Sequence, residues 1–156
     1  MSSPSVTPEE LLDSADQLLT SPVAGIDNLW PQTCALLIRL ALELTLDRHW
    51  ARALPAAAEC GMRQQLLLLP SYGGLDAALL AREAWLGLAG ATHHHAYELA
   101  PTAAELRGWH TTVTRLTALL APLPRARRLR LVAGPSWRAL LASIGAIDRP
   151  ASHWQS

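Results

Sequence analysis

Residues 29–53, LWPQTCALLIRLALELTLDRHWARA, are the stretch that decides the fold. In helical projection, apolar side chains cover most of the circumference of this segment. A single charged stripe interrupts them, formed at four-residue intervals by Arg39, Glu43 and Asp47. A helix that is apolar nearly all round normally lies in the middle of a bundle. We therefore predict a central helix here.

The limits of this central helix are set by local signals. Asp27 or Asn28 is expected to cap its start, and Pro55 bounds its end, because proline cannot donate the hydrogen bond that would continue the helix. Among its leucines, Leu40 and Leu44 are expected to be core residues.

Two capping boxes mark helices on either side of the central one. Thr7 with Glu10 begins a helix that should end near Thr20, and Thr102 with Glu105 begins another. The second of these helices carries apolar residues at positions 106, 109, 113, 116 and 120, a spacing that favours packing at a shallow angle.

Two further helices are expected between the central helix and Thr102. One spans about residues 56–69, with an interruption at Gly61 and an end at Pro70, and residues 71–74 then form a loop. The other spans about residues 75–92. Its two glycines, Gly87 and Gly90, weaken a helix unless they allow a neighbour to approach closely.

Composition supports the same architecture. The 156 residues include no Phe and very little Ile and Val, but much Leu and Ala, which favour helices. We expect one all-α domain: residues 1–6 disordered, residues 7–121 a bundle of four to five main helices, and residues 122–156 a short basic C-terminal appendage with a strand-like stretch near 127–132 and a short helix at about 136–144.

The charges of the chain are unevenly distributed. Residues 1–121 contain 7 Arg and 12 acidic residues, a balance of −5, whereas residues 122–156 contain 6 Arg and one acid, a balance of +5. The appendage is expected to fold back on the acidic bundle; the alternative is an anionic partner such as RNA. The candidate anion-binding residues are Arg125, Arg127, Arg128 and Arg130.

Several protein classes do not fit the sequence. Cys34 and Cys60 form no disulfide framework, and Cys34 is expected to be a small buried apolar residue. Neither a secretion signal nor an apolar stretch long enough to cross a membrane is present. Because every positively charged residue is Arg, a GC-rich bacterial source is expected. The lack of secretion and membrane signals favours a cytoplasmic location. No cofactor is expected.

The run His93-His94-His95 is the pattern with the most chemical promise, because imidazole binds metals and titrates near neutral pH. Glu98 lies near these histidines in sequence. Neighbouring helical residues point about 100° apart, so three consecutive histidines cannot all face one ion. A metal site would therefore combine His94 and His95 with His110. The alternative is that one histidine caps the end of the preceding helix, where a cation is favoured.

Arg39 and Glu43 are the second candidate site. The pair is expected at a solvated edge, and the alternative is a buried, mutually satisfied pair. An apolar helix with this pair, followed by a helix that ends in histidine, resembles the HEPN (higher eukaryotes and prokaryotes nucleotide-binding) domains over residues 7–120.

The HEPN resemblance implies a compact bundle, often dimeric, in toxin–antitoxin or phage-defence systems. Many members of this family cleave RNA with an Arg and a His four to six residues apart. Here the Arg nearest before His93 is Arg82, eleven residues upstream, so the resemblance does not extend to ribonuclease activity.

Three hypotheses about function follow. The first is a non-catalytic or divergent HEPN-like module that binds RNA or a protein. The second is a metal-binding protein that uses residues 93–95. The third is a structural subunit that buries a leucine-rich surface in a homo-oligomer.

Overall fold

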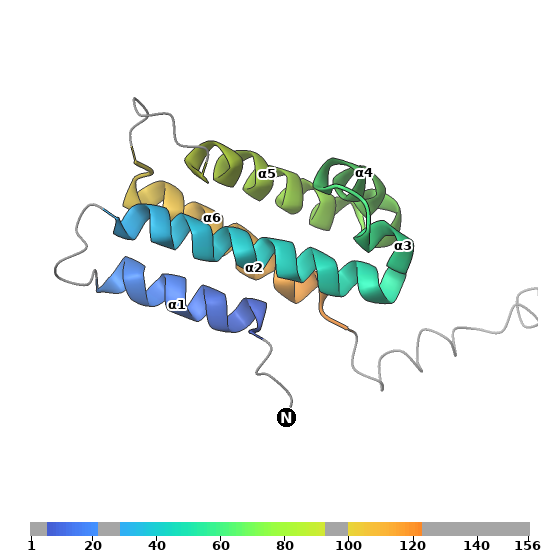
Figure 1. Cartoon of the computed structure of the whole chain (residues 1–156), viewed down its shortest axis with the longest axis horizontal. Coiled ribbons are helices and arrows are strands. Elements are labelled where there is room, and N and C mark those ends of the chain that lie inside the picture. The colour runs from blue at the N-terminus through green and yellow to red at the C-terminus, as the bar shows by residue number, and fades with distance from the viewer. Residues whose placement is uncertain (1–5, 22–28, 93–99, 123–156) are drawn as a thin grey trace, which may run out of the picture. The chain divides into compact units, whose positions relative to one another are not determined.

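The computed structural model describes residues 6–21, 29–92 and 100–122, which fold into helices without any strand (Figure 1). The predicted all-α fold is therefore confirmed. The expected strand near 127–132 and helix at about 136–144 lie outside the described residues. The helices are α1 (Pro8–Thr20), α2 (Trp30–Ala53), α3 (Pro55–Ala58), α4 (Met62–Tyr72), α5 (Leu75–Thr92) and α6 (Ala103–Leu120).

α2 and α6 form the centre of the bundle. α2 packs against α1, α5 and α6, and α6 in turn packs against α1 and α5. α1 and α5 lie on opposite sides of this central pair, and α4 lies beside α5 (Figure 1). α2 is thus covered by helices on three sides, which confirms its predicted central place.

The core is built around one face of α2. Ile38, Leu42, Leu46 and Trp50 follow one another at four-residue intervals and are fully buried. Cys34 continues this face; it is also fully buried, as predicted, and burial together with the nearby Asp16 raises the pKa of its thiol to about 11. The helices around α2 complete the core with Leu12, Ala15, Leu19, Leu69, Ala81, Ala84, Leu88, Leu106, Val113, Leu116 and Leu120.

The prediction that Leu40 is a core residue is wrong. Its side chain is 39% exposed, and Leu44 is only half-buried. The reason is helical geometry: Leu40 lies two residues from both Ile38 and Leu42, about 200° around the helix from each. It therefore points to the side of α2 that no other helix covers.

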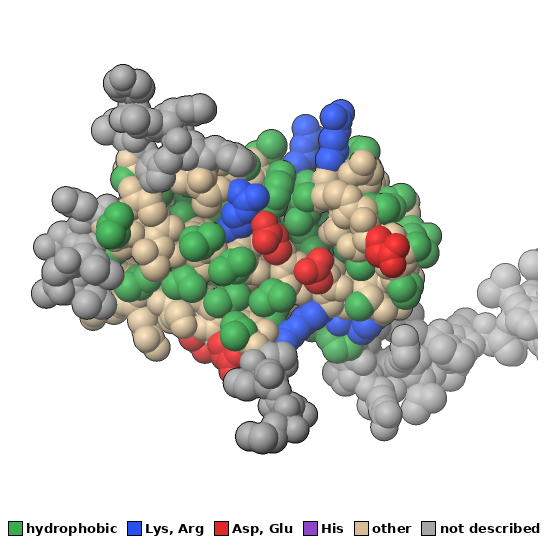
Figure 2. Space-filling model, viewed as in Figure 1, with side chains coloured by type: hydrophobic (Ala, Val, Ile, Leu, Met, Phe, Trp, Pro, Cys, Tyr) green, Lys and Arg blue, Asp and Glu red, His purple; other side chains and the backbone are tan. Residues whose placement is uncertain are grey.

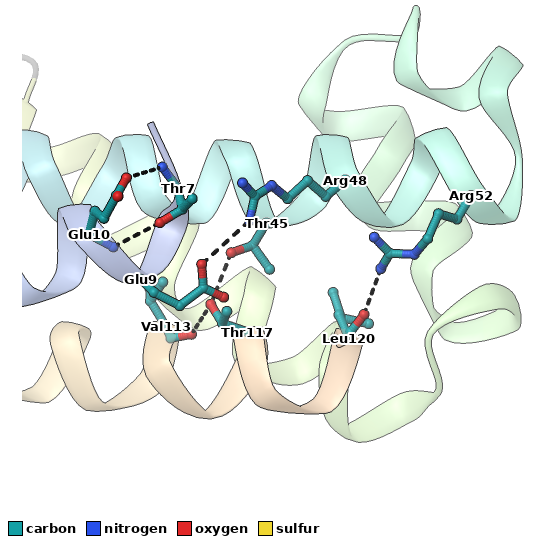
Figure 3. Close-up of polar contacts among 9 residues, drawn as sticks. All are labelled: Thr7, Glu9, Glu10, Thr45, Arg48, Arg52, Val113, Thr117 and Leu120. Carbon is teal, nitrogen blue, oxygen red and sulfur yellow. Dashed lines mark hydrogen bonds and ion pairs between the residues drawn. The ribbon is translucent and has the colours of Figure 1, made fainter. Parts of the chain in front are cut away.

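Both predicted capping boxes are present. Thr7 Oγ1 accepts a hydrogen bond from the Glu10 amide at 3.1 Å, and the Glu10 carboxylate accepts one from the Thr7 amide at 2.8 Å (Figure 3). Thr102 and Glu105 make the same exchange at the start of α6. α2 differs from the prediction, because its N-cap is Leu29, which makes no side-chain cap; the expected caps Asp27 and Asn28 lie outside the described residues.

The region between α2 and α5 also differs from the prediction. The chain breaks between α3 and α4 near Gly61, but Pro70 does not end α4, which continues to Tyr72. Pro70 removes one backbone donor, yet the following turn is still closed by the Gly73 amide, which donates to the Leu69 carbonyl at 2.7 Å.

Polar contacts tie the helices together along the α1–α2–α6 side (Figure 3). The hydroxyls of Thr45 and Thr117 lie 2.9 Å apart and join α2 to α6. Arg52 donates to the Leu120 carbonyl at 2.8 Å, which satisfies a carbonyl at the end of α6. Arg48 forms a longer contact, 3.4 Å, with Glu9 of α1.

Candidate functional site

Arg39 lies at the contact between α2 and α5. Its Nε donates to Glu43 Oε1 at 3.0 Å, one helical turn away, and its Nη1 donates to the hydroxyl of Thr92 at the end of α5. Its guanidinium lies 4.6 Å from the ring centroid of Trp85. Only 19% of the Arg39 side chain and 35% of the Glu43 side chain are exposed, so the pair is not the solvated edge that we expected.

The contacts of Arg39 leave little of its guanidinium free for a ligand. A carboxylate, a hydroxyl and an aromatic face already surround it, and the hydroxyl of Thr92 is itself held by the Leu88 carbonyl at 2.8 Å. The Glu43 carboxylate also offsets the positive charge that an anion would need. The contacts of Arg39 with Thr92 and Trp85 therefore fix α2 against α5. The side chains that flank Arg39 are left exposed to solvent.

The structure does not bring the predicted metal ligands together. His93, His94, His95 and Glu98 lie outside the described residues. His110 lies on α6, and its Nε2 is 3.1 Å from the Leu12 carbonyl, which ties α6 to α1. Within the described ranges, no three His, Cys, Asp or Glu side chains are grouped so that they could hold a metal ion.

The four arginines of the candidate anion-binding cluster, Arg125, Arg127, Arg128 and Arg130, also lie outside the described residues. The arginines of the bundle are largely engaged in other contacts. Arg52 and Arg107 donate to backbone carbonyls, and Arg39 and Arg48 pair with carboxylates. Two of the seven arginines of residues 1–121 are therefore paired with carboxylates of the bundle.

A buried polar group that the sequence analysis missed is His49, on the inner side of α2. Its ring packs edge-on against Trp50 at 5.0 Å, and Trp50 packs edge-on against Tyr72 at 5.7 Å. Burial, and secondarily the charge of Arg52, lowers the pKa of His49, which favours the neutral form of the ring. The sequence could have indicated this burial, because His49 lies seven residues, or two helical turns, after Leu42 and therefore on the same core side of α2.

Gly87 allows α5 to approach α6 closely. A Cβ at this position would lie 2.3 Å from the indole nitrogen of Trp109, whereas one at Gly90 would meet nothing within 4 Å. The close-approach prediction is thus confirmed for Gly87 and wrong for Gly90. A cavity of about 460 Å³ opens beside these residues, but its one carboxylate, from Glu105, is already used to cap α6.

A group of exposed leucines is the most distinctive surface feature of the bundle. Between 39% and 65% of each of these side chains is accessible. We call this group the leucine face; it consists of Leu29, Leu36 and Leu40 along α2 and Leu75, Leu79 and Leu86 along α5. Figure 2 shows hydrophobic side chains gathered along α2 on this side of the molecule, next to arginine and acidic side chains.

The leucines on the two helices border one contact line. Leu36 and Glu43 lie three and four residues from Arg39, while Leu86 directly follows Trp85. Because Arg39 stacks on Trp85, these side chains flank the place where α2 meets α5. The leucine face therefore consists of exposed leucines on two adjacent helices, with the charged Arg39–Glu43 pair at the line where the helices meet.

Comparison with known proteins identified no relative. No protein-family model matches the chain, and no curated protein or solved structure matches it either. The HEPN resemblance therefore has no support beyond the helical texture on which it was based. Within the described ranges, no helix has both the length and the apolar character that crossing a bilayer requires.

Proposed function

We propose that the helical bundle is a protein-binding module that binds through its leucine face. The observation that carries this proposal is the exposure of six leucines on two adjacent helices, because monomeric proteins rarely leave a large contiguous apolar patch uncovered. This proposal draws on the protein-partner part of the first hypothesis and does not depend on membership of the HEPN family.

Charge favours a protein partner over RNA. The segment that includes the bundle, residues 1–121, has a net charge of −5, and four of its seven arginines contact acceptors within the bundle. RNA binding depends strongly on neutralising phosphates with basic side chains. An RNA-binding function would therefore have to depend on Arg125–Arg130.

The contact between Arg39 and Trp85 gives this surface a defined shape. A binding surface needs rigid supporting elements if its contact residues are to stay in place. The hydrogen bond to Thr92 and the stacking on Trp85 join α2 to α5 beneath the leucines, and Glu43 orients the Arg39 guanidinium from within α2. Arg39 and Glu43 thus act as positioning residues in this proposal.

Pull-down from cells with matched surface variants tests the proposal. We expect Leu36→Glu with Leu79→Glu to lose a partner that wild type and Leu119→Glu both retain. Leu119 is a suitable control because it is a comparably exposed leucine, 54%, on the opposite central helix α6. The partner is then purified, and calorimetry must show that it binds wild type and Leu119→Glu but not the variant with both Leu36→Glu and Leu79→Glu.

Titration with single-stranded RNA tests the alternative that the chain binds RNA. If Arg125, Arg127, Arg128 and Arg130 contact phosphates, RNA affinity should fall with salt at a slope of up to roughly −3, about −0.7 per contact. Such binding, abolished by replacing these arginines with Ala and unaffected by the leucine variants, would contradict the proposal.

A further inference from the structure

The exposed residues of the leucine face repeat at the spacing of helix–helix interfaces. On α2 this spacing connects the outward positions 29, 33, 36, 40, 43 and 47. On α5 it connects 75, 79, 82 and 86, and Asp76, Glu83 and Gly90 are also exposed beside this line. Steps of alternately four and three residues keep side chains in a nearly straight line and are typical of surfaces that pack against another helix at a shallow angle. The spacing indicates that the partner presents helices.

Both signs of charge lie within this surface. Arg82 is exposed on α5 between Leu79 and Leu86, and it has no ion-pair partner among the residues that the structure describes. Asp47 continues the leucine line on α2. Its pKa is raised, first by partial burial and then by the charge of Glu43. Among the described residues, no cation lies within ion-pair distance of its carboxylate.

A surface that carries both signs of charge can complement itself. In a two-fold symmetric pair, any contact from residue i of one copy to residue j of the other is made twice. An arginine on α5 and a carboxylate on α2 can then form two equivalent ion pairs. A surface with only one sign would require a different, oppositely charged partner instead.

The size of the surface is sufficient for a dimer. The shorter of the two helices, α5, has 18 residues and is therefore about 27 Å long. Two neighbouring helices about 10 Å across present an outer surface of roughly 540 Å² before the relief of the side chains is counted. Two copies would together bury roughly 1,080 Å², just above the ~1,000 Å² total that a biological interface should clear.

We infer that the leucine face binds a second copy of this chain, forming a two-fold dimer in which α2 and α5 of one copy pack against α2 and α5 of the other, and Arg82 of one copy pairs with Asp47 of the other. This inference rests on the proposed function and names the partner. The four interface helices form a second, intermolecular bundle, while α1 and α6 remain outside the interface.

Sedimentation equilibrium of the full-length chain tests the dimer. We expect wild type and Leu119→Glu to show the same concentration-dependent dimerisation, and Leu36→Glu with Leu79→Glu to stay monomeric with an unchanged helical circular dichroism spectrum. Because the substituted leucines are exposed in the monomer, loss of folding is not expected.

A charge exchange tests the proposed pairing independently of the leucines. Arg82→Asp and Asp47→Arg should each raise the dimer dissociation constant by about tenfold. The combination of both substitutions should restore it, since the pair is re-formed with reversed charges. Wild-type dimerisation with no rescue in the double variant would overturn the Arg82–Asp47 pairing.

The failure of this inference and the failure of the proposed function are distinguishable. A chain that is monomeric at every concentration overturns the dimer. The proposed function still holds in that case if Leu36→Glu with Leu79→Glu loses a different purified partner that Leu119→Glu binds. If neither self-association nor such a partner depends on the leucine face, both are wrong.

Discussion

α2 and α6 both contact α1 and α5, yet they present different side chains to solvent. The exposed residues of α6 are mainly Glu, Arg, Thr, Gly and Ala, with Leu119 as the one well-exposed leucine of that helix. The outer side of α2 instead exposes Leu36 and Leu40, with Leu29 at its start. Packing within the bundle explains the inner leucines of both helices equally well. It does not explain the outer leucines of α2, and we propose that they form a second surface, which binds a partner.

The largest expected effect separates the two sides of α2. Leu42→Ala should reduce the free energy of unfolding by about 2–5 kcal/mol, because it leaves a cavity at a fully buried position. In the monomer, at low protein concentration, Leu40→Ala, two residues away, should cost no more than about 0.5 kcal/mol, the usual range for exposed sites. Urea unfolding of both variants measures the difference. Equal losses would show that the outer side of α2 is as buried as its inner side.

The next largest effect compares the side of α6 that packs against α5 with its solvent side. Gly87→Ala should destabilise the protein by about 1–3 kcal/mol, because the new methyl group would collide with the rigid indole of Trp109. Gly108→Ala, on the solvent side of α6, meets nothing within 4 Å and should raise stability by up to about 1 kcal/mol. Thermal unfolding checks both signs. A stabilising Gly87→Ala would contradict the close approach of α5 and α6.

The smallest expected effect is the pH dependence of the unfolding free energy that two carboxylates cause, Glu105 on α6 and Asp47 on α2. Hydrogen bonds from the backbone and side chain of Thr102 lower the pKa of Glu105, so its contribution stabilises the fold above its unfolded pKa and is lost as pH falls through the folded value. Burial and Glu43 raise the pKa of Asp47, so its charge destabilises the fold above that pKa, and stability is regained as pH falls through it.

The corresponding variants should therefore change stability in opposite directions. At neutral pH and at protein concentrations low enough to keep the chain monomeric, Asp47→Asn should stabilise the protein and Glu105→Gln should destabilise it. Both should approach wild type in acid, where the carboxyl groups are protonated. Unfolding free energies measured from neutral to acidic pH decide the matter, and two variants that change stability in the same direction would refute the assigned causes.

The sequence predicted the helices well because their signals are local. The capping boxes at Thr7 and Thr102 depend on residues three positions apart, and both were found as predicted. The exposure of Leu40 could not be predicted in the same way, because α2 is apolar on nearly every side and its sequence does not show which side lacks a neighbour. Pro70 inside α4 was missed for a similar reason, since surrounding contacts decide whether a helix continues past a proline.

The candidate site was predicted only in part. Spacing alone identified Arg39 and Glu43 as a pair, and they do interact. Their contacts with Trp85 and Thr92 were not predictable, because those residues are 46 and 53 positions away from Arg39 in the chain. The leucine face was missed as a site because each of its residues, taken singly, fits a core position of a helix.

Hydroxyl-radical footprinting of the full-length chain at increasing protein concentration tests the central claim most directly, because it reports the accessibility of individual side chains on both central helices. If the leucine face binds a second copy, oxidation of Leu36, Leu40 and Leu79 should slow as concentration rises, while oxidation of Leu119 on α6 should keep the same rate. Unchanged rates at all four leucines, or protection of Leu119 alone, would show that the outer side of α2 is not the surface that binds a second copy.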